Sequence, residues 1–241
     1  MKNTCRAILI DAGGTLLSTR EPAPQIYATI SYKYGCVAPM KDIENRFLEV
    51  WHLRNGLSAL QGPLAHKNER LFWTRFVHEV FEPYGPMERF DEFIDELQQI
   101  FLSPETWQVY PDVLPTLEIL RAKGISLAVV SNWDSQLPGL LERVGLSGHF
   151  SAVFASALVG WAKPAKEIFE MALKHVGAAP EEVVHVGDSA LDDVAGARQV
   201  GIHGILLDRL GMYPPDGMPV IRSLSDLPRL LETGDYAIKK S

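Results

Sequence analysis

Short apolar runs alternate with amphipathic stretches along most of this chain. Five of the runs are rich in β-branched residues and predict strands at 6–11, 125–131, 152–156, 183–187 and 204–207. Continuous apolar runs of this length are typical of strands that are buried on both faces of a parallel sheet.

Two of the stretches between these runs carry the start and stop signals of helices. Pro111 and Pro115 stand at the start of one that ends at Gly124, and Pro164 opens another that ends at Gly177. Proline is favoured in the first turn of a helix and glycine just beyond the last turn. The alternation of strand and helix predicts an α/β fold with a doubly wound, Rossmann-like parallel sheet as its core.

The interval from Leu17 to Trp107 interrupts this alternation. It contains no convincing strand, and it has four helical stretches, at 24–34, 41–54, 69–81 and 89–101. We therefore expect an inserted four-helix cap over the carboxyl end of the sheet. Residues 1–16 and 108–241 would form the core domain, and residues 17–107 would form the cap. Residues 208–219 are predicted to be a loop before a final short helix near 224–231.

The composition is that of a globular protein, with 46% hydrophobic and 22% charged residues in a chain of 241. The apolar runs are far shorter than the roughly 20 residues of a membrane-spanning helix, and the N-terminal run is too short for a signal peptide. A net charge of -7 disfavours nucleic acid and anionic membranes as partners. Cys5 and Cys36 have no metal-ligand spacing. We expect a cytoplasmic protein with reduced cysteines and a small-molecule substrate; the oligomeric state stays open, and a monomer is compatible with the sequence.

Polar residues stand where each predicted strand ends. The first strand ends in Asp11, the second in Ser131 and Asn132, and the fourth in Asp188, while Lys163 follows the third. Ligands of open parallel sheets bind outside the carboxyl ends of the strands, so we expect these side chains to meet in one crevice.

The chemistry of that group points to a cation and to phosphoryl transfer. Asp11 and Asp188 would repel each other unless a cation lay between them, and ligands that offer only oxygen suit Mg²⁺. A carboxylate beside Mg²⁺ and Lys163 stays ionised and can attack phosphorus, while the lysine and the metal spread the charge of the transferring group. Ser131 can hold a phosphoryl oxygen. The sequence has no G-x-G-x-x-G or P-loop string for cradling a nucleotide.

Four strings occur in the order of the four motifs of the haloacid dehalogenase superfamily and resemble them: ILIDAGGTLL, VVSNWD, GWAKPAKEIF and VVHVGDSALDDVAGARQVG. The resemblance covers nearly the whole chain. A helical segment between the first and second motifs is similar to the cap of subfamily I, which sets substrate choice. The Ser-Asn pair and the Gly-Trp-x-Lys-Pro string resemble in particular the subgroup of the haloacid dehalogenase-like hydrolase domain-containing protein 3.

The resemblance implies a role for each residue that matches a motif. As catalytic residues it implies Asp11 as the nucleophile and Lys163 as the charge stabiliser. The substrate-binding residues would be Thr15, Ser131 and Asn132. The Mg²⁺ ligands would be Asp11, the backbone carbonyl of Gly13, and Asp188. Asp193 would orient the lysine or a metal-bound water, and Asp192 would lie next to these residues without binding the metal.

Gly13 departs from the phosphatases of the superfamily, which carry a second aspartate two residues after the nucleophile. That side chain protonates the leaving oxygen and then activates water, a contribution typically worth ~10²–10⁴ in rate. The resemblance therefore implies a Mg²⁺-dependent hydrolase with weakened general acid catalysis. Two alternatives stay open: a metal-independent dehalogenase, which Asp188 disfavours because that chemistry needs no metal, and a catalytically weak binding or regulatory protein, which Gly13 favours.

Three further residues have two interpretations each. Asp134 lies close enough to be a surrogate acid, although Asp134 and Ser135 are expected to cap the helix that follows. Trp161 either lines the mouth of the pocket or packs on the sheet. His185 stands inside an apolar strand, where we expect a buried histidine with satisfied hydrogen bonds and no catalytic role.

Overall fold

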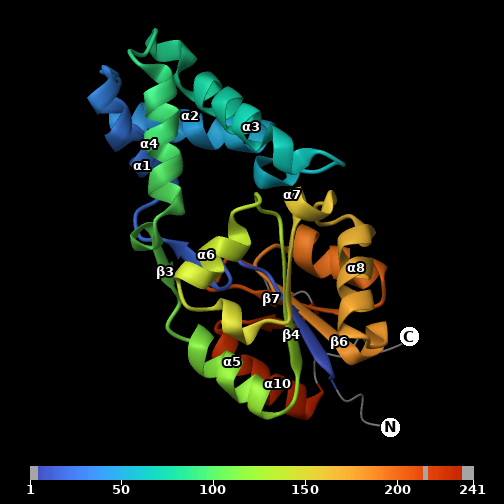
Figure 1. Cartoon of the computed structure of the whole chain (residues 1–241). Helices are drawn as coiled ribbons and strands as arrows, with labels where there is room; N and C mark the ends of the chain where they lie inside the picture. The colour runs from blue at the N-terminus through green and yellow to red at the C-terminus, as the bar shows by residue number, and fades with distance from the viewer. Residues whose placement is uncertain (1–4, 214–216, 235–241) are drawn as a thin grey trace.

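A six-stranded parallel sheet forms the centre of the computed structural model, which describes residues 5–213 and 217–234 (Figure 1). The strands lie in the order β5-β4-β1-β6-β7-β8. Their bounds are β1 Ala7–Ile10, β4 Ser126–Ser131, β5 Ala152–Ala155, β6 Val183–Gly187, β7 His203–Leu207 and β8 Val220–Ile221. This confirms the doubly wound fold and the five predicted strands. The sequence did not predict β8, because two residues are too short to show a pattern.

The strand order changes direction at β1, which places the site. From β1 the chain goes to β4 and β5 on one side, and it later returns to β6, β7 and β8 on the other side. Where the strand order reverses, the loops that follow neighbouring strands run to opposite faces of the sheet. A crevice opens between these loops at the carboxyl ends of the strands. The residues that follow β1, β4 and β6 therefore border one another.

Helices cover both faces of the sheet, and alternate strand residues pack against each layer. Ile8 and Ile10 pack with α5, α6 and α10, whereas Ala7 and Leu9 pack with α8 and α9. The bounds are α5 Val113–Ala122, α6 Leu137–Arg143, α7 Ser156–Val159, α8 Lys166–Val176, α9 Gly196–Gln199 and α10 Leu227–Thr233. Two buried layers explain why the strands are apolar throughout rather than alternating.

The helix signals in the sequence are close to the observed ends. α5 ends before Gly124 and α8 before Gly177, and both glycines have positive φ, as predicted. α8 begins at Lys166 and not at Pro164, because Pro164 lies in a turn closed by the Ala165 N–H and the Ala162 carbonyl (2.9 Å). Residues 208–213 and 217–219 form no helix or strand, as predicted, and 214–216 lie outside the described residues.

Four helices between residues 23 and 102 form a separate apolar cluster above the sheet (Figure 1). They are α1 Ala23–Ser31, α2 Met40–Leu53, α3 Ala65–Phe81 and α4 Phe90–Leu102, which confirms the four predicted helical stretches. They share the side of α7, the short helix that directly follows the carboxyl end of β5. Within the described residues, none of the helices combines the length and the apolar character needed to cross a membrane.

A two-stranded antiparallel ribbon joins the four helices to the sheet. It consists of β2 Leu17–Thr19 and β3 Trp107–Val109, with Leu17 opposite Val109 and Thr19 opposite Trp107. The prediction that this interval has no strand was therefore wrong at both of its ends. Each strand has three residues and finds its partner about 90 positions away, so no local pattern reveals either strand.

Candidate active site

Asp11 continues β1 by one residue at the carboxyl edge of the sheet. Its backbone N–H donates to the Val186 carbonyl (3.0 Å), and its side chain is only 5% exposed. The chain then turns at Gly14, where φ is +70° and a Cβ would lie 2.1 Å from Asp188 Oδ2. Any other residue at position 14 would collide with that carboxylate. Gly14 thus lets the first loop pass directly against Asp188.

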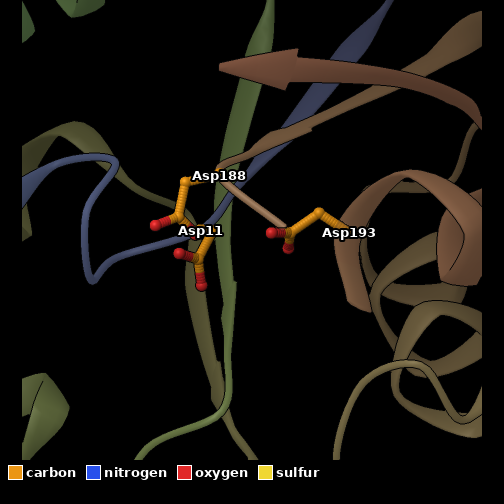
Figure 2. Close-up of side chains that lie close together, drawn as sticks. All are labelled: Asp11, Asp188 and Asp193. Atoms are coloured by element: carbon orange, nitrogen blue, oxygen red, sulfur yellow. The ribbon is translucent and has the colours of Figure 1, made fainter. Parts of the chain in front are cut away.

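Three carboxylates meet at this edge: Asp11, Asp188 and Asp193 (Figure 2). Each offers one oxygen, and the three oxygens lie within 4.8 Å of one another. Asp11 and Asp193 are buried, whereas the side chain of Asp188 reaches solvent. Desolvation by the surrounding atoms and repulsion from Asp11 and Asp193 raise the pKa of Asp188 to about 7. Burial also raises the pKa of Asp11, against the opposing charge of Lys163.

Lys163 is the buried counter-ion of this group. Its Nζ lies 2.6 Å from Asp11 Oδ1 and 2.5 Å from Asp193 Oδ1. Burial by itself would lower the pKa of Lys163, but the two carboxylates outweigh it and raise that pKa. The lysine therefore stays charged at neutral pH, and one cation faces three acidic groups.

Asp193 is held from three sides, one of which the sequence did not indicate. The segment Ala190–Ala195 forms a π-helical turn, and Asp193 Oδ2 accepts the Ser189 N–H (3.0 Å). The His185 ring donates from Nε2 to Asp193 Oδ1 (2.8 Å). Burial works against ionisation, but Lys163 and His185 outweigh it and lower the pKa of Asp193. His185 is fully buried, as expected, but the prediction that its hydrogen bonds are satisfied was wrong for Nδ1, which has no partner among the described residues. The ring also contacts the site, and the one signal for this was a polar residue inside an apolar strand.

Two buried hydroxyls border Asp11. Ser131 ends β4, is 2% exposed and hydrogen-bonds the Asp11 carboxylate. Thr15 is fully buried, and among the described residues its hydroxyl has no hydrogen-bond partner. A buried polar atom left without a partner is costly, so an oxygen-rich ligand would complete this position.

Asn132 connects three parts of the chain and leaves little of its amide for a substrate. Its Oδ1 accepts the Lys163 N–H (2.7 Å), and its Nδ2 donates to the Lys163 carbonyl (2.9 Å) and to Ser58 Oγ (2.9 Å). The side chain thus fixes the backbone of Lys163 beneath the helical segment. A contact between Asn132 and substrate stays a prediction.

Gly13 faces the indole of Trp133. A Cβ at position 13 would lie 3.1 Å from Trp133 Cζ3, and the backbone of Gly13 needs no positive φ. Trp133 is buried, so its ring occupies the space beside the nucleophile loop into which a side chain at position 13 would project. No local pattern in the chain predicted this packing, because it joins residues 120 positions apart.

The residues after Trp133 contact the helical segment and do not cap α6, whose N-cap is Gln136 without a side-chain bond. Asp134 accepts from Trp73 Nε1 (3.3 Å) and from the Gln136 N–H (3.0 Å), and burial raises its pKa to about 6. Ser135 donates from its N–H and its hydroxyl to Glu69 (2.6 and 2.7 Å). The capping prediction was therefore wrong for Ser135, whose partner is on α3, whereas Asp134 does accept a backbone N–H at the start of α6.

Asp192 and Trp161 lie toward the outside. Asp192 is half-buried, its N–H donates to Ser189 Oγ (3.0 Å), and burial raises its pKa. Trp161 is 45% exposed. The roles predicted for these two residues stay predictions.

Arg209 contacts the backbone of the loop after β1. The sequence did not suggest a role for this residue. Its guanidinium binds both oxygens of Asp112 (2.9 and 3.0 Å) and donates to the Thr15 carbonyl (2.8 Å). It also lies 3.9 Å from the centre of the Tyr110 ring. The planar, forked geometry of arginine suits such a set of contacts.

The donor set fits a hard divalent cation. Three carboxylates beside one ammonium leave excess negative charge, and all the available ligands are oxygens, as Mg²⁺ prefers. Besides desolvation, the negative charges of Asp11 and Asp193 raise the pKa of Asp188, as expected for crowded carboxylates. Asp11, Asp188 and the carbonyl of Gly13 are the candidate ligands.

Comparison with known proteins gives consistent results. The sequence model of the haloacid dehalogenase-like hydrolases matches residues 5–201. The haloacid dehalogenase-like hydrolase domain-containing protein 3 of Danio rerio is 31% identical over 240 residues, which cover 96% of this chain and 98% of that protein. A phosphoserine phosphatase of Thermus thermophilus is 35% identical over 69% of this chain and 65% of its own length. The crystal structure of an HAD phosphatase from Thermococcus onnurineus has a TM-score of 0.68 and 30% identity, covering 94% of this chain and 97% of that one.

Proposed function

The chain belongs to the haloacid dehalogenase-like hydrolase family, and we propose that it is a Mg²⁺-dependent phosphohydrolase that acts on a small phosphorylated metabolite through an aspartyl-phosphate at Asp11. The observation that carries the proposal is the contact of 2.6 Å between Asp11 Oδ1 and the buried Lys163 Nζ. A buried, ionised carboxylate beside a fixed cation is a suitable nucleophile for phosphorus.

The residues around Asp11 suit two successive displacements at phosphorus. In the first, an Asp11 oxygen bonds to phosphorus as the bond to the leaving oxygen breaks; in the second, water attacks phosphorus, releases phosphate and restores the carboxylate. Lys163 stays charged throughout and attracts the phosphoryl oxygens. The hydroxyls of Thr15 and Ser131 would each donate a hydrogen bond to one of those oxygens.

Mg²⁺ bound at Asp11, Asp188 and the Gly13 carbonyl would neutralise charge on the phosphoryl group. Asp193 would keep Lys163 in place through its bond of 2.5 Å. Because Gly13 carries no acid, the leaving oxygen departs as an anion. Substrates whose leaving groups are stable anions should therefore react faster than alkyl phosphates.

We also propose the division into a core of residues 1–16 and 108–241 and a cap of residues 17–107. In support, helices α1–α4 bury a cluster of their own, and they contact the core loops through Glu69–Ser135 and Ser58–Asn132. A cap of this kind would cover the substrate and exclude water while the nucleophile reacts.

Aryl phosphate hydrolysis by Asp11→Asn and Asp188→Asn variants tests the proposal. Asparagine nearly keeps the size of the side chain but removes the nucleophile or the metal charge, so turnover should fall by at least ~10³-fold in Asp11→Asn. Calorimetric Mg²⁺ binding should weaken in both variants. Asp91→Asn, on the exposed first turn of α4, is the matched control and should behave as wild type.

Two results would contradict the proposal. Hydrolysis at the wild-type rate by a folded Asp11→Asn protein would exclude covalent catalysis at this residue. Turnover of 2-chloropropionate without Mg²⁺, together with inactivity on all phosphates, would instead indicate a metal-independent dehalogenase.

A further inference from the structure

A cavity of about 670 Å³ lies between helices α1–α4 and the loop that follows β4. Four of the five tryptophans of the chain line it: Trp51, Trp73, Trp107 and Trp133. Cavities of this size bind small organic molecules, and a mostly apolar wall selects an apolar group. No residue of this cavity has been assigned to the chemistry at Asp11.

Two pairs of rings in the lining are stacked, and the other pairs are tilted or edge-on. Phe47 stacks on Trp51 (centroids 5.8 Å apart, planes at 12°), and Trp51 stacks on Trp73 (6.3 Å, 24°). On the core side, Trp107 lies against Trp133 (5.3 Å). Contacts between aromatic rings are more favourable than their buried area alone accounts for, so these walls suit a planar aromatic ligand better than a flexible chain.

The acidic groups in the lining are already engaged by the protein. Glu69 accepts both hydrogen bonds of Ser135, and Asp134 accepts from Trp73 Nε1 and the Gln136 N–H. These carboxylates therefore do not require a polar ligand for their hydrogen bonds. Most of the remaining wall is made of aromatic and aliphatic side chains, with Lys67 and Arg70 among the basic residues of the lining.

Trp133 lies between the cavity and the loop that carries Asp11. One side of its ring lines the cavity, and Cζ3 lies 3.1 Å from the position that a Cβ of Gly13 would take. Gly13 is two residues from the nucleophile. The cavity therefore borders the loop that carries Asp11.

The chemistry at position 13 and the shape of the cavity are independent observations that favour the same leaving group. Without an acid at Gly13, the leaving oxygen must depart unprotonated, which a phenolate does readily and an alkoxide does not. We infer that the cavity binds the aromatic ring of an aryl phosphate whose phosphoryl group lies at Asp11. This inference rests on the proposed function, and it adds to it the class of substrate.

Calorimetry with inert phosphonates tests the inference without turnover. In a buffer that contains Mg²⁺, 2-naphthylmethylphosphonate should bind at least roughly 30-fold more tightly than methylphosphonate, as expected when one aromatic group is buried. It should also bind more tightly than octylphosphonate. Binding should quench tryptophan fluorescence, because four of the five tryptophans line the cavity.

Leu48→Glu is the test variant and Leu71→Glu its control. Leu48 lines the cavity and is 47% exposed, whereas Leu71 is 49% exposed on α3 and is not part of the lining. A carboxylate at the cavity wall should remove most of the preference for the naphthyl compound in Leu48→Glu. Leu71→Glu should keep the wild-type preference, which excludes a general effect of added charge.

The outcomes separate this inference from the proposed function. A naphthyl preference that Leu48→Glu abolishes, in a protein without phosphatase activity, would support the cavity assignment and reject the function. Turnover that depends on Asp11, with equal affinity for all three phosphonates, would overturn the inference and keep the function. A preference for octylphosphonate, or a naphthyl preference that survives in Leu48→Glu, would also overturn it.

Discussion

At the scale of single residues, the space beside Gly13 determines how the missing acid could be restored. The backbone at Gly13 accepts any residue, but a Cβ there would lie 3.1 Å from Trp133 Cζ3, so the indole must shift by a few tenths of an ångström. Glycine and tryptophan at these two positions fill a volume that aspartate and tryptophan together would exceed.

We therefore expect Gly13→Asp to act together with Trp133→Phe. The double variant should raise alkyl phosphate turnover by about 10²-fold, and aryl phosphate turnover much less, because only the alkoxide needs the proton. Gly13→Asp alone should give a smaller gain. Steady-state kcat on both substrate types for wild type, each single variant and the double variant measures the coupling. Equal gains on both substrate types would show that the aspartate acts on the metal site or on the attacking water and not as an acid for the leaving group.

Asp188 gives the site a pH dependence near neutrality. Its pKa is raised to about 7, so at the proposed site Mg²⁺ would compete with a proton below that pH. The Mg²⁺ affinity measured by calorimetry should therefore fall roughly tenfold for each pH unit below about 7. In Asp188→Asn, the weaker remaining affinity should vary little between pH 6 and pH 8 if Asp188 is the titrating group.

The same group affects stability in the absence of metal. Between the ordinary pKa of 3.8 and about 7, folded Asp188 keeps a proton that the unfolded chain has released. The unfolding free energy should therefore decrease as pH rises through this window, and Mg²⁺ should reverse that loss. Urea denaturation at several pH values, with and without Mg²⁺, measures both effects. A metal-free protein that becomes more stable from pH 5 to pH 7 would contradict the assignment.

At the scale of elements, the loop after β1 depends on a contact with a residue that follows β7, two strands away in the sheet. Arg209, just after β7, holds the Thr15 carbonyl and Asp112 together with a guanidinium that is largely buried. Asp112 in turn accepts the Leu224 N–H and the Ser223 hydroxyl (2.8 and 2.7 Å). The nucleophile loop, the start of α5 and the segment before α10 thus share one carboxylate.

Arg209→Lys should destabilise the protein, because an ammonium cannot bind both carboxylate oxygens and two carbonyls in one plane. We expect a loss of about 1–3 kcal/mol in unfolding free energy, and a lower affinity for phosphonates through the displaced loop. Arg222→Lys is the matched control, since Arg222 is half-exposed and reaches Asp208 through one nitrogen (2.8 Å). Urea denaturation that shows equal losses in both variants would exclude a special role for Arg209.

At the scale of the whole molecule, the sequence predicted what is locally patterned. Apolar runs of four to six residues marked the strands, and the polar residues at their ends marked the crevice, because parallel strands bring their carboxyl ends to one edge. Asp11, Asp188, Asp193 and Lys163 do lie together. Their roles follow from the resemblance and stay predictions.

What the sequence could not predict depends on contacts between distant segments. The β2–β3 ribbon pairs residues about 90 positions apart, and Trp133 faces Gly13 across 120 positions. The hydrogen bonds of Asn132 to Lys163 and of His185 to Asp193 were not predicted, because hydrogen-bond partners are set by packing and not by a residue's neighbours in the chain. The cavity that carries our inference is formed by residues of α1–α4, β2, β3, α6 and the loop after β4, so no single segment indicates it.

The antiparallel ribbon also bears on how such a chain can change over evolution. Since Leu17 is opposite Val109, the segment between them starts and finishes on adjacent backbones, one strand spacing apart. A short hairpin turn could close that gap, and so could an unrelated insertion of almost any length. New specificities could therefore be acquired by exchanging the whole insertion, while the carboxylates and the lysine keep the positions that the sheet gives them. At this ribbon, the segment proposed to select the substrate could be replaced during evolution without changing the residues proposed to carry out the reaction.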